Sequence, residues 1–211
     1  MKKKMLFLGF ANRAMPVTFT AVVCGVLGMW LALCGRVDAG MICLMMAGVF
    51  DMFDGPIARG KKERVPDEKR FGIELDSLAD VINFGFVPPV VLYAFGLSQW
   101  YFIPIFLLYL LAGITRLAYF NVLAFRAVEG EAAGDYFIGM PITCAAGIFP
   151  LFWLIANLLP ARFGQILLAC VMFVMAILFV SPIHFPKVKK RHYPFMLLYI
   201  VVLIIAYVLR R

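Results

Sequence analysis

The sequence is poor in charged residues, and acidic residues are especially scarce. Only 15% of its 211 residues are charged, and they include just 12 Asp and Glu, whereas an ordinary soluble domain carries about 25% charged residues. Hydrophobic residues make up 64% of the chain, and the mean hydropathy is +0.94. These values exclude an ordinary soluble globule. We expect no separate water-soluble catalytic domain, so the chemistry must lie within or beside membrane helices.

Two further features are missing: a C-x-x-C cysteine pair and a basic surface interleaved with aromatic residues. The five cysteines all lie within apolar runs, which favours buried free thiols over metal or disulfide use. The net charge of +8 comes from short clusters of Lys and Arg between the apolar runs. This pattern indicates membrane topology rather than nucleic-acid binding.

Seven apolar runs are long enough to cross a membrane as helices, at about 15–35, 38–57, 73–97, 101–123, 137–159, 163–182 and 193–209. A cleaved signal peptide is the alternative for the first run, but Asn12, Arg13 and Pro16 separate it from the basic start. With a cytoplasmic N-terminus, sixteen of the twenty basic residues fall on the cytoplasmic side, as the positive-inside rule requires.

We therefore predict an all-α integral membrane protein of the cytoplasmic (inner) membrane. Its polytopic bundle has six core transmembrane helices plus a seventh C-terminal helix. The chain is expected to form one membrane domain over residues 1–211, with a core at about 12–182. The last helix, at about 193–209, is expected to be a peripheral addition to that core.

Four aspartates lie inside or at the edge of two consecutive apolar runs, where an ionisable residue is a functional hypothesis by default. Asp51 and Asp54 are spaced i, i+3, and Asp76 and Asp80 are spaced i, i+4, so each pair shares one helix face. The two helices are antiparallel, and both pairs are expected at similar depth. Facing carboxylates repel one another in a low-dielectric site unless cations compensate. Because only oxygen ligands are nearby, we expect Mg²⁺ or Mn²⁺, two per site.

Residues suited to a phosphate site are interleaved with these aspartates. Gly55 allows close backbone approach, and Ala58 adds little bulk. Arg59 supplies a planar donor fork that fits phosphate oxygens, and Gly72 lies at the start of the next helix. Taken alone, the small residues are more typical of close helix packing in a membrane. Their order among the aspartates favours a phosphate site.

Written in full, Asp51-Met-Phe-Asp54-Gly55-Pro-Ile-Ala58-Arg59 and then Gly72-Ile-Glu-Leu-Asp76-Ser-Leu-Ala-Asp80 resembles the signature of the CDP-alcohol phosphotransferases, D-x2-D-G-x2-A-R-x8-G-x3-D-x3-D. All eight fixed positions match. The stretches 74–85, 116–122 and 136–141 look like the phosphatidylserine synthase (CDP-diacylglycerol--serine O-phosphatidyltransferase) branch of this family. The resemblance covers roughly residues 12–182.

The resemblance implies an enzyme in which an alcohol hydroxyl attacks the lipid-linked phosphorus of CDP-diacylglycerol and CMP departs. In this branch the alcohol is L-serine and the product is phosphatidylserine. By position, Asp51, Asp54 and Asp76 would bind one metal ion, and Asp76 and Asp80 would share the second. Asp80 would also accept the proton of the attacking hydroxyl. The nucleotide site would be lined by Gly55, Ala58, Arg59 and Gly72, and the family suggests a homodimer.

The sequence departs from the signature between Arg59 and Gly72, where it has 12 residues in place of eight. The segment Lys61 to Asp67 is charged and contains Pro66, so we expect it to bulge into the cytosol. Lys69 stands where relatives often carry a Ser or Thr that touches the nucleotide's phosphates, and we include it as a candidate phosphate contact.

The carboxylate of serine requires a cation in the cavity, and Arg116 is our candidate because it is otherwise unexplained in an apolar run. Asn83 and Asn121 are candidate polar partners. The alternative is that Arg116 extends to the lipid headgroups.

Other functions remain open. Within the family, the acceptor could be inositol phosphate, glycerol phosphate or choline, or the donor could be an archaeal CDP-lipid. A cation transporter would also use intramembrane carboxylates, although it needs polar groups that continue to the far side of the membrane. A pure scaffold explains none of the aspartates.

Overall fold

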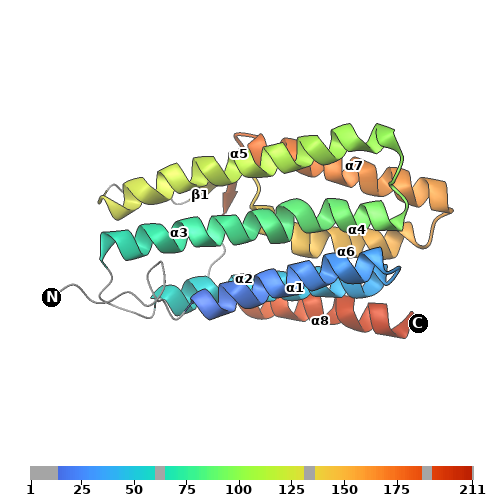
Figure 1. Ribbon diagram of the computed structural model, residues 1–211, viewed down its shortest axis with the longest axis horizontal. Coiled ribbons are helices and arrows are strands. Elements are labelled where there is room, and N and C mark those ends of the chain that lie inside the picture. The colour runs from blue at the N-terminus through green and yellow to red at the C-terminus, as the bar shows by residue number, and fades with distance from the viewer. Residues whose placement is uncertain (1–13, 60–64, 131–135, 187–191, 211) are drawn as a thin grey trace.

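The computed structural model describes residues 14–59, 65–130, 136–186 and 192–210, and within them eight α-helices form an elongated bundle in which α3 and α4 follow each other end to end (Figure 1). They are α1 Met15–Leu33, α2 Val37–Arg59, α3 Pro66–Asp80, α4 Val87–Phe95, α5 Ile103–Val128, α6 Ala145–Ala156, α7 Ala161–Val180 and α8 Tyr193–Leu209. Short elements connect them: the π-helical turn η1 Val81–Phe86, the 3₁₀ turns η2 Trp100–Phe102 and η3 Ile142–Cys144, and the strands β1 Tyr136–Ile138 and β2 His184–Pro186.

The first two helices form a tightly packed antiparallel pair. A Cβ atom added to Gly40 of α2 would lie 2.9 Å from the carbonyl oxygen of Gly28 in α1, and one added to Gly28 would lie 2.9 Å from Cβ of Cys43. Small residues at such a crossing allow the two backbones to approach closely. The pair therefore holds α2, and the aspartates near its end, at a fixed distance from α1.

The third expected helix forms as one continuous helical rod of 30 residues, Pro66–Phe95, interrupted only by the π-helical turn η1. The buried hydroxyl of Tyr109 in α5 donates a hydrogen bond of 2.6 Å to the carbonyl oxygen of Phe84 within this turn. A π-turn changes the helical register and often lies at a functional site. Here it begins directly after Asp80.

Two expected boundaries were wrong. Pro66 and Asp67 do not belong to a bulging loop, because they form the first turn of α3. Proline is favoured at this position, where its missing N–H leaves no bond unmade. Residues 61–64 of the expected loop lie outside the described residues. The run expected at 137–159 begins as strand β1, which pairs antiparallel with β2. Gly139 (φ +77°) then turns the chain into η3 and α6.

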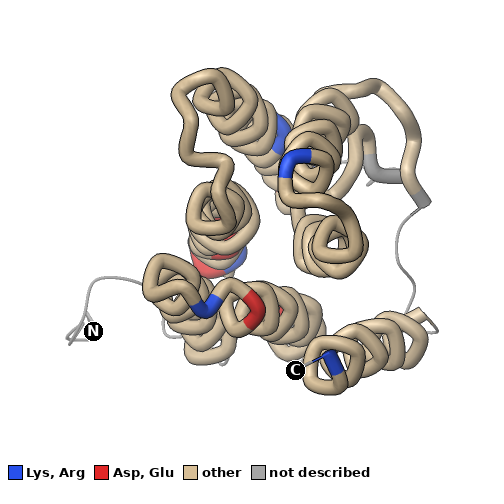
Figure 2. The backbone as a smooth tube through the Cα atoms, turned by 90° about the vertical axis from the view of Figure 1, so that its right-hand side faces the viewer, with Lys and Arg blue, Asp and Glu red and all other residues tan. Residues whose placement is uncertain are grey.

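The fold is all-α apart from this two-stranded ribbon, and it is that of an integral membrane protein. Four helical segments are long and apolar enough to cross a membrane, namely Met15–Leu33, Pro66–Phe95, Trp100–Val128 and Ala161–Val180, and two shorter apolar helices are Ile142–Ala156 and Tyr193–Leu209. Viewed along the bundle, few charged residues mark the helices (Figure 2). Helices occupy all seven expected places, while the number of crossings, six plus a seventh, stays a prediction.

The core lies where α2, α4, α5, α6 and α7 meet. Tyr109, Phe149 and Phe179 are fully or almost fully buried there, and their rings pack with centroids 5.3 to 5.7 Å apart. The outer surface instead exposes large apolar side chains such as Trp30, Leu111 and Phe163. Such a surface suits a hydrocarbon solvent, where apolar side chains need no cover.

Candidate functional site

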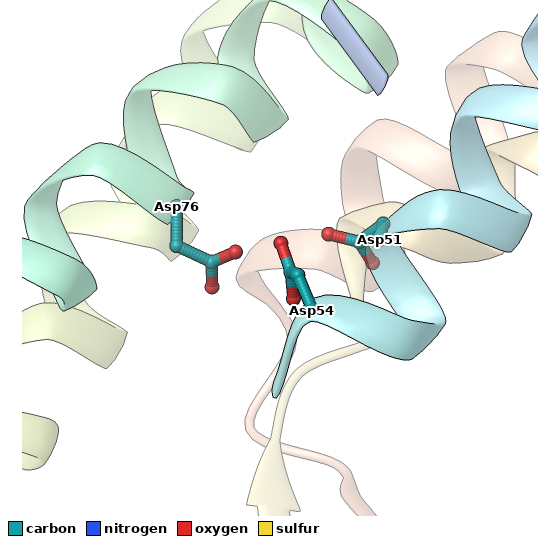
Figure 3. Close-up of side chains that lie close together, drawn as sticks. All are labelled: Asp51, Asp54 and Asp76. Atoms are coloured by element: carbon teal, nitrogen blue, oxygen red, sulfur yellow. The ribbon is translucent and has the colours of Figure 1, made fainter. Parts of the chain in front are cut away.

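Two neighbouring helices bring three aspartates together. Asp51 and Asp54 project from α2 and Asp76 projects from α3, and one carboxylate oxygen from each lies within 4.8 Å of the others. Figure 3 shows the three side chains pointing toward one another across the space between α2 and α3. The expectation that both helix faces meet at one depth is thus confirmed for these three residues.

The fourth aspartate, Asp80, lies one turn farther along α3 and is only 7% exposed. Its carboxyl group lies close enough to that of Asp51 for the two to interact. Its Oδ1 atom is buried and has no hydrogen-bond partner among the described residues. A buried oxygen of this kind costs free energy unless something pairs with it.

The donor set fits a hard divalent cation. The three clustered side chains offer only carboxylate oxygens, which are the ligands that Mg²⁺ and Mn²⁺ prefer. The unpaired Oδ1 of Asp80 beside Asp51 offers a further oxygen. A bound cation would also relieve the mutual repulsion of carboxylates held at this distance in a medium of low dielectric.

Thr18 of α1 contributes to the site, and the sequence analysis missed it. Its hydroxyl donates a hydrogen bond of 3.0 Å to Oδ2 of Asp54, and Thr18 is 5% exposed. This bond fixes the orientation of the Asp54 carboxylate. A single threonine inside an apolar run gives a weak signal, because threonine hydroxyls in helices usually bond to the preceding turn, as Thr18 also does toward Ala14.

Arg116 of α5 points into the protein rather than toward the headgroups. It is 8% exposed, and its guanidinium carbon lies 5.2 Å from the centre of the Phe120 ring, an arrangement that allows a cation–π interaction. It interacts electrostatically with Asp51, Asp76 and Asp80. Its Nε atom is buried without a hydrogen-bond partner in the described part of the chain, so a donor remains available to a bound anion.

The two candidate asparagines lie outside the cavity wall. Asn121 accepts a hydrogen bond of 2.6 Å from Ser77 Oγ and donates one of 3.3 Å to Glu74, so it ties α5 to α3 on both sides of Asp76. Asn83 is 1% exposed, in the π-helical turn η1, and its Oδ1 lies where a side chain on Gly25 would otherwise be. Asn121 therefore supports the helices that carry the site, whereas the buried Oδ1 of Asn83 has no hydrogen-bond partner among the described residues.

A cavity of about 540 Å³ connects these groups. It is lined by the aspartates of α2 and α3, by Arg116 and Phe120 of α5, and by residues of η3, α6 and α8. The lining residues are Gly48, Asp51, Met52, Asp54, Gly55, Pro56, Asp76, Asp80, Arg116, Phe120, Pro141, Thr143, Cys144, Ala146, Gly147, Ile148, Tyr193, Met196, Tyr199 and Ile200. This volume suits a ligand of drug-like size.

The other predicted phosphate residues are placed as follows. Gly55 lines the cavity. Gly72 has open space beside its Cα atom, because an added Cβ would meet nothing within 4 Å. Lys69 is an exposed residue of the first turns of α3. Ala58 and Arg59 end α2, and their side chains lie outside the described set.

The site lies within the part of the chain that matches a known family. The model of the family described as CDP-alcohol phosphatidyltransferase matches residues 11–180, a range that contains all four aspartates and Arg116. The last helix, α8, lies beyond it.

Several curated proteins are similar over much of the chain. The archaetidylserine synthase of Methanothermobacter thermautotrophicus is 34% identical over 78% of this chain and 65% of its own. The CDP-diacylglycerol--serine O-phosphatidyltransferase of Mycobacterium tuberculosis is 33% identical over 71% of this chain and 50% of its own. The Bacillus subtilis protein of the same name is 32% identical over 82% of this chain and 89% of its own length. The chain thus spans only one half to two thirds of the length of the first two relatives.

Proposed function

The chain belongs to the CDP-alcohol phosphatidyltransferase family, and from this premise we propose that it transfers the phosphatidyl group of CDP-diacylglycerol to the hydroxyl of L-serine. The products are phosphatidylserine and CMP. The observation that carries the proposal is the cluster of Asp51, Asp54 and Asp76 in a cavity that also holds the buried cation Arg116. Relatives named for serine transfer support the choice of acceptor.

In this reaction Asp51, Asp54 and Asp76 would hold one divalent cation, and Asp76 and Asp80 would share a second. When bound, Mg²⁺ or Mn²⁺ neutralises the carboxylates and stabilises the charge that develops on the departing phosphate. The serine hydroxyl oxygen forms a bond to the lipid-linked phosphorus while the bond from that phosphorus to the CMP oxygen breaks. Asp80, whose Oδ1 is unpaired, accepts the hydroxyl proton.

Binding of the two substrates divides between the ends of the aspartate cluster. Gly55, Ala58, Arg59 and Gly72, with Lys69, form the nucleotide side, as the family signature implies. On the other side, Arg116 pairs with the carboxylate of serine, a role supported by its burial and its unpaired Nε. Asn121 acts indirectly, since it holds α5 against α3, and Asn83, whose buried Oδ1 has no partner among the described residues, is a candidate polar partner.

A second donor is favoured by one observation. One of the relatives is named an archaetidylserine synthase, so an archaeal CDP-lipid is a candidate in place of CDP-diacylglycerol.

Inositol phosphate and glycerol phosphate are less suitable acceptors, because a phosphate group needs more cations than Arg116 supplies. Choline lacks the carboxylate that Arg116 would bind. A transporter role is not supported, because it needs polar groups that continue to the far side of the membrane, and the outer halves of the expected helices are nearly free of charge.

The proposed setting is the cytoplasmic membrane, with the N-terminus and the site on the cytoplasmic side. The distribution of basic residues supports this orientation. We also propose that residues 1–211 form one domain and that the protein is a homodimer, as the family suggests. Cross-linking in native membranes tests the dimer.

One assay tests the function. Purified full-length protein is given CDP-diacylglycerol and Mn²⁺ or Mg²⁺, with labelled serine, inositol phosphate, glycerol phosphate or choline offered separately. CMP release with serine alone, and label in phosphatidylserine, is the expected result. CMP release with a different acceptor and not with serine would mean that this other alcohol is the acceptor. No CMP release with any acceptor, from CDP-diacylglycerol or from a CDP-archaeol donor, would contradict the enzyme proposal.

A further inference from the structure

Helix α8 lies beyond the family match, yet it lines the same cavity as the aspartates. Tyr193, Met196, Tyr199 and Ile200 line the same cavity as Asp51 and Asp80. We propose that α8 is part of the lipid-binding site, where its N-terminal half receives the diacylglyceryl part of the CDP-lipid. This inference rests on the proposed function and adds to it the wall that holds the lipid.

The spacing of the four residues places them on one face of α8. Positions 193, 196 and 200 recur at intervals of three and four, and 199 lies beside them, as one stripe of a helix requires. The opposite side of the helix exposes Phe195, Leu198 and Val202, which are 71%, 60% and 54% accessible. Helix α8 therefore has one apolar face toward the bilayer and a second toward the cavity.

Two tyrosine hydroxyls fix α8 against α6. Tyr199 donates a hydrogen bond of 3.0 Å to the carbonyl oxygen of Gly147, and Tyr207 donates one of 2.9 Å to that of Pro150. The absence of a side chain at Gly147 makes the first contact possible, because an added Cβ would come within 3.1 Å of the Tyr199 ring. The helix thus lies at a defined place beside the cavity, although the expected role was only a peripheral addition.

The chemistry of the wall identifies its occupant. Met196 and Tyr199 line the cavity and are each 40% exposed, so apolar surface remains uncovered in a site that also carries carboxylates. A polar acceptor such as serine cannot cover that surface, whereas the glycerol and first chain carbons of a CDP-lipid can. The polar and apolar parts of the CDP-lipid then match those of the cavity. The pyrophosphate lies at the aspartates, and the acyl chains lead past α8 into the bilayer.

The first test separates lipid binding from acceptor binding. Met196→Trp fills the cavity face of α8, and Leu198→Trp adds the same side chain to the bilayer face as a matched control. CMP release is measured against CDP-diacylglycerol at saturating serine, and then against serine at saturating lipid. We expect Met196→Trp to raise the KM for the lipid about tenfold and to leave the KM for serine within about twofold. Leu198→Trp should change neither.

Tyr199→Phe and Tyr207→Phe form a second matched pair. Each loses one bond to α6, but only Tyr199 lines the cavity. A raised lipid KM in Tyr199→Phe alone supports the proposal. Equal effects of both substitutions would mean that α8 only braces the bundle, and an effect of Met196→Trp on serine alone would assign the wall to the acceptor. Either result overturns the proposal.

A binding measurement on the unaltered full-length protein needs no turnover. CDP-diacylglycerol with a photoreactive diazirine near the ester end of one chain is cross-linked in nanodiscs, and the labelled peptides are mapped. Label within residues 193–200 that excess CDP-diacylglycerol displaces is expected, and label confined to other helices would overturn the proposal. If this label forms but no acceptor yields CMP, the proposed function fails while the lipid site stands.

Discussion

The two ends of helix α2 carry carboxylates in opposite situations. At its N-terminal end, Asp38 accepts a hydrogen bond of 2.7 Å from the indole Nε1 of Trp153, and it lies in the first turn, where a negative charge is stabilised by the helix dipole. At its other end, Asp51 and Asp54 meet Asp76 with carboxylate oxygens within 4.8 Å. The first carboxylate has protein partners suited to its charge. The other three carboxylates lie against one another, although Thr18 donates a hydrogen bond to Asp54 and Arg116 lies nearby.

This difference separates structural from functional carboxylates. Burying a charge is tolerable where hydrogen bonds and dipoles compensate it, and otherwise a cation or ligand must do so. Unpaired buried atoms gather at the aspartate end, because Oδ1 of Asp80 and Nε of Arg116 both lack partners within the described residues. The following predictions test whether the two ends really differ in this way.

The largest effect is expected at Asp80. Asp80→Asn removes the proposed base and should lower CMP release by about 10²- to 10⁴-fold, while the protein remains folded. Asp38→Asn is the matched control, since it alters a carboxylate of the same helix bundle without touching the cavity. Rates are measured under saturating CDP-diacylglycerol and serine. Comparable losses in both variants would remove the distinction between the two ends.

Substitution of Arg116 should give the next largest effect, and this effect should appear as a raised KM for serine. A hydrogen bond to a charged group contributes about 1.5–3 kcal/mol, so Arg116→Ala should raise that KM about ten- to a hundredfold. Arg116→Lys keeps the charge but loses the planar fork, and an intermediate value is expected. Steady-state kinetics at saturating lipid measure both variants. Unchanged serine KM values in the two would remove Arg116 from the acceptor site.

Thr18 tests whether Asp54 must be held in one orientation. Thr18→Val keeps the shape of the side chain but removes its hydrogen bond to Asp54. We expect CMP release to fall about threefold to tenfold, because the bond is lost but the carboxylate stays. The loss should be partly recovered at higher Mn²⁺ concentration. Thr20→Val, on the same helix with a hydroxyl bonded only to Pro16 in the described structure, is the control and should have no effect on activity.

The smallest effect on activity is expected at Trp153. Trp153→Phe leaves Asp38 without its indole donor and should lower the free energy of unfolding by about 1–3 kcal/mol, with CMP release unchanged. Thermal unfolding in detergent reports the stability. A fall in CMP release beyond what the lost stability explains would show that the Asp38 end also serves the reaction.

The meeting of three of the four aspartates was predictable because its information is local. The i, i+3 and i, i+4 spacings define helix faces, and one short connection sets the two faces against each other, so Asp51, Asp54 and Asp76 meet as expected. The burial of Arg116 was likewise anticipated from a lone cation in an apolar run. The positions of the helices were predicted from hydropathy. Two boundaries were wrong, because α3 begins as early as Pro66 and because a strand precedes Gly139.

Contacts between distant segments were not predictable in the same way. Nothing near Thr18 in the sequence indicates that its hydroxyl reaches Asp54, 36 residues away. Asn121 was expected in the acceptor pocket, but its bonds to Ser77 and Glu74 depend on how α5 packs on α3. The place of α8 beside the cavity depends on Tyr199 meeting Gly147. Such contacts are set by tertiary packing, which spacing along one helix does not encode.

Cation binding tests the central claim most directly. Mn²⁺ is titrated into metal-free full-length protein, and free Mn²⁺ is followed by electron paramagnetic resonance for the unaltered chain, Asp38→Asn and Asp76→Asn. The unaltered chain and Asp38→Asn should bind up to two ions per chain, and Asp76→Asn should lose that binding because its carboxylate is shared by both proposed sites. Binding that is unchanged in Asp76→Asn, or lost in Asp38→Asn, would contradict the account.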